Sequence, residues 1–152
     1  MDLKKKIKIT LFNLLIFNDV SSVIFLDDYA HHPTEIKATI TAANQLKHNK
    51  LWVVFQPHTY TRTHSLFNEF ANAFKNVDEV ILTDIYAARE KDTGVVSSKM
   101  LSDEINKVSN NCTYISTFDE IKNYLKENVK ENDLVLTVGA GTITNLGYSL
   151  ID

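Results

Sequence analysis

Short runs of apolar residues alternate along this chain with stretches in which apolar residues recur every three or four positions. The runs that predict strands are 23–26, 51–55, 80–82, 112–115 and 134–138. The stretches with helical spacing are 33–46, 61–74, 97–108, 117–125 and 143–150. Because strand and helix alternate throughout, the pattern predicts right-handed crossovers. The expected fold is α/β: a single domain with an open, mostly parallel, doubly wound (Rossmann-like) sheet.

Local signals support several of these boundaries. Pro33 suits the first position of a helix, where its missing N–H is not needed. Thr61 or Thr63 is expected to cap the helix that follows the second strand. Thr117 and Glu120 have the spacing of a capping box, which predicts a helix start at that point.

The first 22 residues do not continue this pattern. A basic start precedes the mostly apolar run 7–17, which resembles a signal peptide, but Lys8, Thr10 and Asn13 interrupt the run and no small-x-small cleavage site follows. The run is also shorter than the about 20 apolar residues of a membrane span. We interpret 1–22 as an atypical N-terminal extension or boundary remnant, forming a strand or a helix, and 23–152 as the domain.

Composition places the chain among ordinary globular domains. Its 152 residues are enough for one core, and 44% are hydrophobic and 23% charged. The net charge of −3 argues against a nucleic-acid partner, which usually requires a basic patch, and no segment predicts a membrane contact. The single cysteine, Cys112, excludes an internal disulfide and is expected to be a buried thiol, which fits a cytoplasmic location.

Polar side chains gather in two short loops, each directly after a predicted strand. The first covers 27–35 and contains Asp27, Asp28, Tyr29, His31 and His32. The second covers 56–63 and contains His58 and Arg62, with His64 beside it. Because the carboxyl ends of parallel strands share one edge of the sheet, both loops are expected at one edge, where ligands bind in such folds. A third connection, 84–96, holds Tyr86 and Arg89 and is long enough to be functional or mobile.

These residue types suit a small polar ligand. The carboxylates of Asp27 and Asp28 can accept hydrogen bonds from ribose hydroxyls or an ammonium group, and Arg62 can hold a carboxylate or phosphate with two N–H groups. Structural roles remain open at this point. Arg62 could form a salt bridge or bond at a helix start, and Asp28 could cap the following helix.

Other chemistry receives less support. Gly139 and Gly141 follow a strand, but the third glycine of a dinucleotide fingerprint would fall on Thr144, so a role in the tight turn and close packing is favoured. Neighbouring histidines in a loop rarely point at one ion, so no metal site is predicted in this chain. The sequence has no G-x-S-x-G elbow of a serine hydrolase and no P-loop.

The two loops also resemble the signatures of a known family. Residues 27–35 read Asp-Asp-Tyr-Ala-His-His-Pro-Thr-Glu and closely resemble the D-D-Y-[AG]-H-H-P-T-E motif of UDP-N-acetylmuramate–L-alanine ligases, within the Mur ligases. Residues 55–63 are similar to the family's second motif, F-Q-P-H-x-[YF]-[ST]-R-T, and 84–90 and 138–141 to later signatures. The resemblance covers about 26–152, in order and at family spacing.

The resemblance implies the C-terminal domain of a three-domain bacterial enzyme of peptidoglycan synthesis, and so of cell wall biogenesis and cell shape. That enzyme uses ATP, with Mg²⁺, to form an acyl phosphate on UDP-N-acetylmuramate, which L-alanine attacks. By resemblance, Asp28 would bond the ATP ribose, while His31, His32, His58 and Arg62 would surround the amino acid. Asp27, Tyr29, Tyr86 and Arg89 are possible further contacts.

Two departures limit what the chain is expected to do. Many relatives carry an arginine where this chain has Thr59, so a second cationic contact is absent or replaced. The family's phosphate loop, magnesium ligands and UDP-binding region are not in this sequence, so we expect the chain to be inactive alone. A truncated protein, an isolated domain or a disrupted gene product all fit. The alternatives are a free-standing nucleotide or amino-acid binding module and a small α/β hydrolase or metal enzyme.

Overall fold

A computed structural model describes residues 7–16 and 19–150, with side chains from residue 23 onward. Its sheet has six strands in the order β1-β2-β6-β3-β4-β5. The strands are β1 (Ile7–Ile16), β2 (Asp19–Asp28), β3 (Leu51–Phe55), β4 (Glu79–Leu82), β5 (Cys112–Tyr114) and β6 (Leu134–Val138). β1 pairs with β2 in the antiparallel direction, whereas the other four pairings are parallel.

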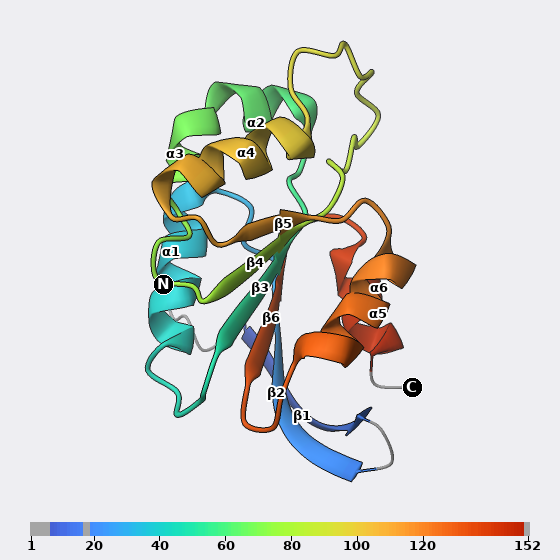
Figure 1. Ribbon diagram of the computed structural model, residues 1–152. Coiled ribbons are helices and arrows are strands. Elements are labelled where there is room, and N and C mark those ends of the chain that lie inside the picture. Colours follow the sequence, from blue (N-terminus) through green and yellow to red (C-terminus); the bar gives the residue numbers. More distant parts are fainter. Residues whose placement is uncertain (1–6, 17–18, 151–152) are drawn as a thin grey trace.

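Helices cover both faces of this sheet. They are α1 (Pro33–Ala43), α2 (Tyr60–Ser65), α3 (Phe67–Ala71), α4 (Ser98–Val108), α5 (Phe118–Asn128) and α6 (Ile143–Ser149). In Figure 1, α1 to α4 lie on one side of the sheet, and α5 and α6 lie on the other. The predicted fold is therefore confirmed: one doubly wound α/β domain whose sheet is mostly parallel.

The strand order makes neighbouring connections diverge at the carboxyl ends of the central strands. The chain moves outward from β3 to β4 and β5, and α5 then returns it to β6, between β2 and β3. As a result, the helices after β2 and β3 lie on one face and the helix after β6 lies on the other. Ligands of open α/β sheets bind where neighbouring connections diverge in this way.

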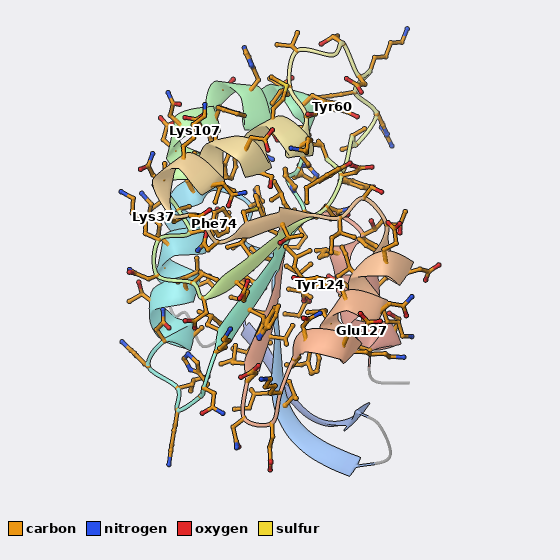
Figure 2. The ribbon with its side chains drawn as sticks, in the orientation of Figure 1. Lys37, Tyr60, Phe74, Lys107, Tyr124 and Glu127 are labelled. Atoms are coloured by element: carbon orange, nitrogen blue, oxygen red, sulfur yellow. The ribbon has the colours of Figure 1, made fainter. Side chains whose placement is uncertain are left out.

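Two apolar layers hold the helices to the sheet. On the α1–α4 face, the ring of Phe55 packs between Phe70 and Phe74, with centroids 5.5 and 5.4 Å away. Figure 2 shows Phe74 lying between the sheet and the helices on that side. On the α5–α6 face, Trp52 and Val54 pack against the helices, including Leu125. All five residues of β3 are buried, as predicted for a strand covered on both faces.

The predicted single helix over 61–74 is wrong. The chain forms two short helices instead, because Leu66 between them leaves helical geometry at φ −113° and ψ 25°. The break still allows Phe70 and Phe74 to enter the core. The predicted caps Thr61 and Thr63 are also wrong: the hydroxyl of Thr59 accepts from the Arg62 N–H, while the hydroxyl of buried Thr63 donates to the Thr59 carbonyl.

Other expectations about the chain hold or are refined. α1 begins with Pro33 as predicted but ends at Ala43, before exposed Leu46. Thr117 caps α5, although the Glu120 carboxylate bonds the Thr117 hydroxyl rather than a backbone N–H. Cys112 is buried, and this burial raises the pKa of its thiol to about 11.

Of the two structures expected for the N-terminal extension, a strand or a helix, the strand is found: β1 pairs with β2 in the antiparallel direction. Within the predicted extension 1–22, residues 7–16 are β1, and β2 begins at Asp19 rather than at Val23. Residues 1–6 lie outside the described part of the chain. The predicted domain boundary at residue 22 stays a prediction.

The buried carboxylate of Asp133 joins the amino ends of two strands, at the opposite end of the sheet from the two motif loops. Asp133 is 2% exposed and lies directly before β6. Its Oδ2 accepts from Trp52 Nε1 at 2.9 Å and from the Lys130 N–H at 3.0 Å, and its Oδ1 accepts from the Lys50 N–H at 3.1 Å. One side chain thus joins the starts of β3 and β6.

This arrangement predicts a large stability cost for Asp133→Ala. Removing the acceptor leaves buried donors unpaired, at about 1–3 kcal/mol for each buried group, so we expect the free energy of unfolding to fall by about 2–4 kcal/mol. Asp133→Asn keeps one oxygen acceptor and should lose less. Urea denaturation followed by circular dichroism measures both.

The control is Asp103→Ala on α4, which removes an exposed ion pair with Lys99. Such pairs contribute at most about 1 kcal/mol. Equal losses for Asp103→Ala and Asp133→Ala would contradict the role given to Asp133.

Candidate functional site

The loops after β3 and β4 continue the sheet beyond its strands. The Thr59 N–H donates to the Tyr86 carbonyl, and the Tyr86 N–H donates to the Pro57 carbonyl, both at 2.8 Å. This parallel bridge holds His58 beside Tyr86. The long loop after β4 is therefore attached to the second motif.

Two glycines allow the loop after β6 to pack closely against the loops after β3 and β4. The Gly139 N–H donates to the Asp28 carbonyl at 3.1 Å, and Gly139 has φ +150°. A Cβ on Gly139 would lie 2.8 Å from the Gln56 carbonyl oxygen, and one on Gly141 would lie 2.6 Å from Tyr86 Cγ. A side chain at either position would displace these neighbours. The structure therefore supports the predicted role of both glycines in the turn and in close packing.

Four rings follow one another along this edge. The ring of His31 lies 5.6 Å from Tyr29 and 6.0 Å from His58, and the ring of His58 lies 5.6 Å from Tyr86. The two predicted motif loops thus meet at one edge, as expected. Tyr29 is 58% exposed, and the other three rings are partly exposed. The row is accessible to a ligand from outside the domain.

Arg62 extends this row from the start of α2. Its Nη1 donates to His58 Nδ1 at 2.9 Å and to the His58 carbonyl at 3.3 Å. Within the described residues, no carboxylate pairs with its guanidinium. Of the two structural roles that were open for Arg62, the salt bridge is not found among those residues, whereas the bond at a helix start is, to the His58 carbonyl. The positive charge therefore remains available for an anionic ligand.

The surroundings of the row favour the neutral form of His58. Burial lowers the pKa of His58, and the charge of Arg62 and the neighbouring His31 ring lower it further, against an opposing effect of Glu90. An arginine can only donate hydrogen bonds. The lone pair of His58 therefore lies on Nδ1, where Arg62 contacts it.

His32 lies next to His31 but has another role. It is the N-cap of α1, where its Nδ1 accepts from the Thr34 N–H at 3.3 Å. It is exposed, and no ring contact within the described part of the chain joins it to His58 or Tyr86. The capping role that remained open for Asp28 belongs to His32.

The two acids are occupied by contacts within the domain. Asp28 is 3% exposed; its Oδ1 accepts from the Ala30 N–H at 3.2 Å, and its Oδ2 accepts from the Thr39 hydroxyl. Asp27 accepts from the hydroxyls of Thr137 at 2.6 Å and Thr144 at 3.3 Å. Both carboxylates thus tie the first loop to its neighbours. A ribose contact by Asp28 stays a prediction, and it requires this carboxylate to become exposed.

Two side chains that shape the site, Gln56 and Glu90, were not among the predicted site residues. The Gln56 amide joins the second motif to the start of α6, accepting from the Ile143 N–H at 3.0 Å and donating to the Thr142 hydroxyl at 3.1 Å. Glu90 accepts from the Thr61 N–H at 3.0 Å, and this bond lowers the pKa of Glu90. Both residues lie in the quoted motifs, but only the fold shows which backbone groups they reach.

Of the remaining predicted positions, one lies in the row and one does not. Tyr86 belongs to the row, whereas Arg89 is exposed at φ +80° and is not brought to the row by any described contact. On the α5 side of the same edge, a cavity of about 360 Å³ includes Gln56, Asp84, Tyr86 and Thr117 in its lining. A hollow of about 570 Å³ lies between α2 and the long loop. Its lining includes Tyr60, which is labelled in Figure 2.

The part of the chain that the structure describes holds neither a cluster of metal ligands nor a membrane-spanning helix. No group of three or more His, Cys, Asp or Glu residues is arranged to hold a metal ion there. Among those same residues, no helix combines the length and the apolar character that crossing a membrane requires.

Thr59 has an unusual backbone conformation. Its φ is +66° and its ψ is 145°, a region that β-branched residues rarely adopt. Such strain typically costs about 1–3 kcal/mol and persists where surrounding contacts impose it. Here the N–H, the carbonyl and the hydroxyl of Thr59 all form hydrogen bonds. These bonds hold His58 and Arg62 in place.

We therefore expect glycine to be tolerated better than alanine at Thr59. Both Thr59→Ala and Thr59→Gly remove the cap, but glycine relieves the strain, so it should leave the domain more stable. Thr117 is the matched control, because it is also a threonine N-cap but has φ −110°. The glycine advantage at Thr59 should exceed that at Thr117 by about 1 kcal/mol or more. Thermal and urea unfolding of the four variants test this, and equal advantages at the two positions would contradict it.

Comparison with known proteins places the chain in a family. Residues 15–141 match the family described as "Mur ligase, glutamate ligase domain". The chain is 57% identical over 132 residues to a UDP-N-acetylmuramate–L-alanine ligase of Clostridium botulinum (strain Hall), covering 87% of this chain and 29% of the relative. It is 51% identical over 133 residues to the ligase of the same name from Clostridium novyi, covering 88% and 29%. The chain thus spans less than a third of these relatives.

Solved structures agree with this assignment. A UDP-N-acetylmuramate–alanine ligase from Thermotoga maritima matches with a TM-score of 0.69 and 26% identity, over 92% of this chain and 28% of that one. A murein peptide ligase from Psychrobacter arcticus, at 21% identity and a TM-score of 0.70 over 91% and 28%, shares the fold. With its row of rings and Arg62 at the carboxyl edge of the sheet, the chain belongs to the Mur ligase family, as a C-terminal domain of that family.

Proposed function

We propose that this domain holds the incoming amino acid in an ATP-dependent ligase that joins L-alanine to UDP-N-acetylmuramate. The relatives with 51% and 57% identity carry the name of that ligase. The first two motifs form one accessible site in this chain. The proposal concerns a longer enzyme, because the chain matches only 29% of its relatives.

The proposal depends mainly on the unneutralised positive charge of Arg62. Its guanidinium is held by the ring and the carbonyl of His58, and no carboxylate neutralises it within the described residues. A guanidinium matches a carboxylate with two parallel N–H donors. Because His58 fixes the side chain in advance, little rotamer entropy is lost when the ligand binds. The carboxylate of L-alanine is the expected partner.

The surroundings of Arg62 suit a small substrate. Tyr29, His31 and His58 line the approach with rings, while His32 stays a predicted contact whose Nδ1 is already used in capping. Thr59 stands where many family members carry arginine, and its hydroxyl caps α2. We infer that Arg62 is the main cationic contact and that no side chain of this loop replaces the second one.

The nucleotide belongs to the same proposal. ATP, with Mg²⁺, would supply the phosphoryl group that activates the carboxylate of UDP-N-acetylmuramate. As placed, Asp28 does not fit a ribose contact, because it is 3% exposed and both oxygens accept within the domain. Contacts from Asp27, Tyr86 or Arg89 to any substrate also remain proposals. A cytoplasmic location is compatible with the buried free thiol of Cys112.

The first test replaces Arg62 by lysine in a full-length ligase in which this domain replaces the matching domain of the Clostridium botulinum relative. Lysine keeps the charge but loses the two-pronged geometry. A charge-assisted hydrogen bond is worth about 1.5–3 kcal/mol, so KM for L-alanine should rise about 10- to 100-fold. Steady-state kinetics with each substrate varied separately measures this change.

The KM for ATP and the melting temperature are the internal controls, and both should stay nearly constant. A fall in kcat with an unchanged KM for L-alanine would indicate a contact made only in the transition state. A lower melting temperature with unchanged kinetic constants would indicate a structural role. Either result would contradict the carboxylate contact.

The second test uses the 152-residue chain alone. Phosphoryl transfer requires a phosphate cradle and a bound metal, and the sequence contains no P-loop. We expect no phosphate release above a blank when ATP, L-alanine and UDP-N-acetylmuramate are supplied. Release that depends on both acceptor substrates would contradict this expectation.

A further inference from the structure

The ring of His58 has one proton position that its contacts allow. Arg62 Nη1 lies 2.9 Å from His58 Nδ1, and a guanidinium has donors but no acceptor. Nδ1 therefore carries the lone pair, and Nε2 carries the proton. His58 thus presents an N–H donor on its other side.

The ring of His31 has the opposite arrangement. Its Nδ1 lies 3.1 Å from the carbonyl oxygen of Tyr29, within hydrogen-bonding geometry. A carbonyl oxygen only accepts, so Nδ1 carries the proton and the lone pair of the neutral ring lies on Nε2. Among the described residues, nothing else hydrogen-bonds to this ring, which is partly exposed. His31 therefore presents an accepting nitrogen at an open surface.

The charges around His31 are few. The ring faces Tyr29 on its own loop and His58 on the neighbouring loop, and His58 in turn contacts Arg62. Glu90 accepts from the Thr61 N–H. Asp28, the nearest acid in sequence, is turned into the domain and bonded to Thr39. Within the described chain no carboxylate competes for the His31 ring. A ligand whose carboxylate binds Arg62 would bring its amino group to the surface that holds His31.

We propose that His31 Nε2 accepts a proton from the amino group of the incoming amino acid. The assignment rests on the proposed function, because it needs an amino acid and an acyl phosphate at this site. An ammonium nitrogen has no lone pair, so one N–H proton must leave before the nitrogen can attack. General bases of this kind contribute about 100- to 10,000-fold to rates.

Atoms, protons and charges balance in this step. One ammonium proton moves to His31 Nε2, and the freed lone pair forms the C–N bond to the acyl carbon. The bond between that carbon and the phosphate oxygen breaks, and its electron pair leaves with the phosphate. The departing phosphate takes the second proton that the nitrogen must lose. The products are an amide, hydrogen phosphate and a His31 imidazolium, whose Nδ1–H still donates to Tyr29.

His48 supplies a matched control outside the site. Its Nδ1 lies 2.7 Å from the carbonyl oxygen of Leu46, two residues earlier, as His31 Nδ1 does with Tyr29. His48 precedes β3, at the opposite end of the strands from the motif loops, so His48→Gln changes a similar ring away from the proposed site. His31→Gln removes the accepting ring nitrogen but should leave the fold unchanged, because His31 makes one exposed hydrogen bond.

The first measurement is long-range ¹H–¹⁵N correlation NMR on the 152-residue chain, at a pH where the histidines are neutral. It reports which ring nitrogen of each histidine carries the proton. We expect the proton on Nδ1 in His31 and on Nε2 in His58. A proton on Nε2 of His31 would overturn the proposal without any assay of activity.

The second measurement uses the full-length ligase carrying this domain. His31→Gln should lower kcat by about 100-fold or more and remove the acid limb of the pH–kcat profile, while His48→Gln stays within about threefold of the unsubstituted enzyme. A higher KM for the amino acid with unchanged kcat would make His31 a binding residue and overturn the proposal. An equal loss of kcat in both variants would also overturn it. If the unsubstituted enzyme formed no product, the proposed function would fail, and this assignment with it.

Discussion

The site depends on how closely three loops approach one another around the carboxyl end of β6. Gly139 and Gly141 leave no room for a Cβ, because the Gln56 carbonyl and the Tyr86 ring occupy that space. The Gln56 amide then fastens the second motif to the start of α6. The Gly139 N–H also bonds the Asp28 carbonyl, which joins the loop after β6 to the end of β2. With the loops after β2 and β3 both held against this loop, the rings of His31 and His58 lie 6.0 Å apart. Side chains from distant parts of the sequence thus form one surface.

Within that surface, residues that hold the loops differ from residues that remain free for a ligand. Asp27, Asp28 and His32 use their polar atoms on neighbouring backbone or hydroxyl groups. Thr59 holds a strained turn through three hydrogen bonds. Among the described residues, the accepting nitrogen of His31 has no hydrogen-bond partner, and the Arg62 guanidinium is held by His58 but pairs with no carboxylate. Most of the motif is therefore framework, and a few atoms carry the proposed chemistry.

The sequence predicted the fold well because its strands are continuous apolar runs and its helices have clear spacing. The 51–55 run is buried throughout, and Pro33 and Thr117 mark helix starts as expected. The break at Leu66 was not predicted, because the apolar residues on both sides of it, including Phe70 and Phe74, recur at helical spacing. For the site, residue types indicated which loops matter, but not which atoms are free. The burial of Asp28 and the strain at Thr59 depend on tertiary contacts that no local pattern contains.

The central claim, that Arg62 receives the carboxylate of the amino acid, is tested most directly by a crystal structure. The full-length ligase carrying this domain would be crystallised with its product, UDP-N-acetylmuramoyl-L-alanine. We predict the alanyl carboxylate about 2.7–3.2 Å from the Arg62 guanidinium nitrogens, with the new amide nitrogen on the side of His31. An alanyl carboxylate bound elsewhere, with Arg62 still bonded only to His58, would contradict the account.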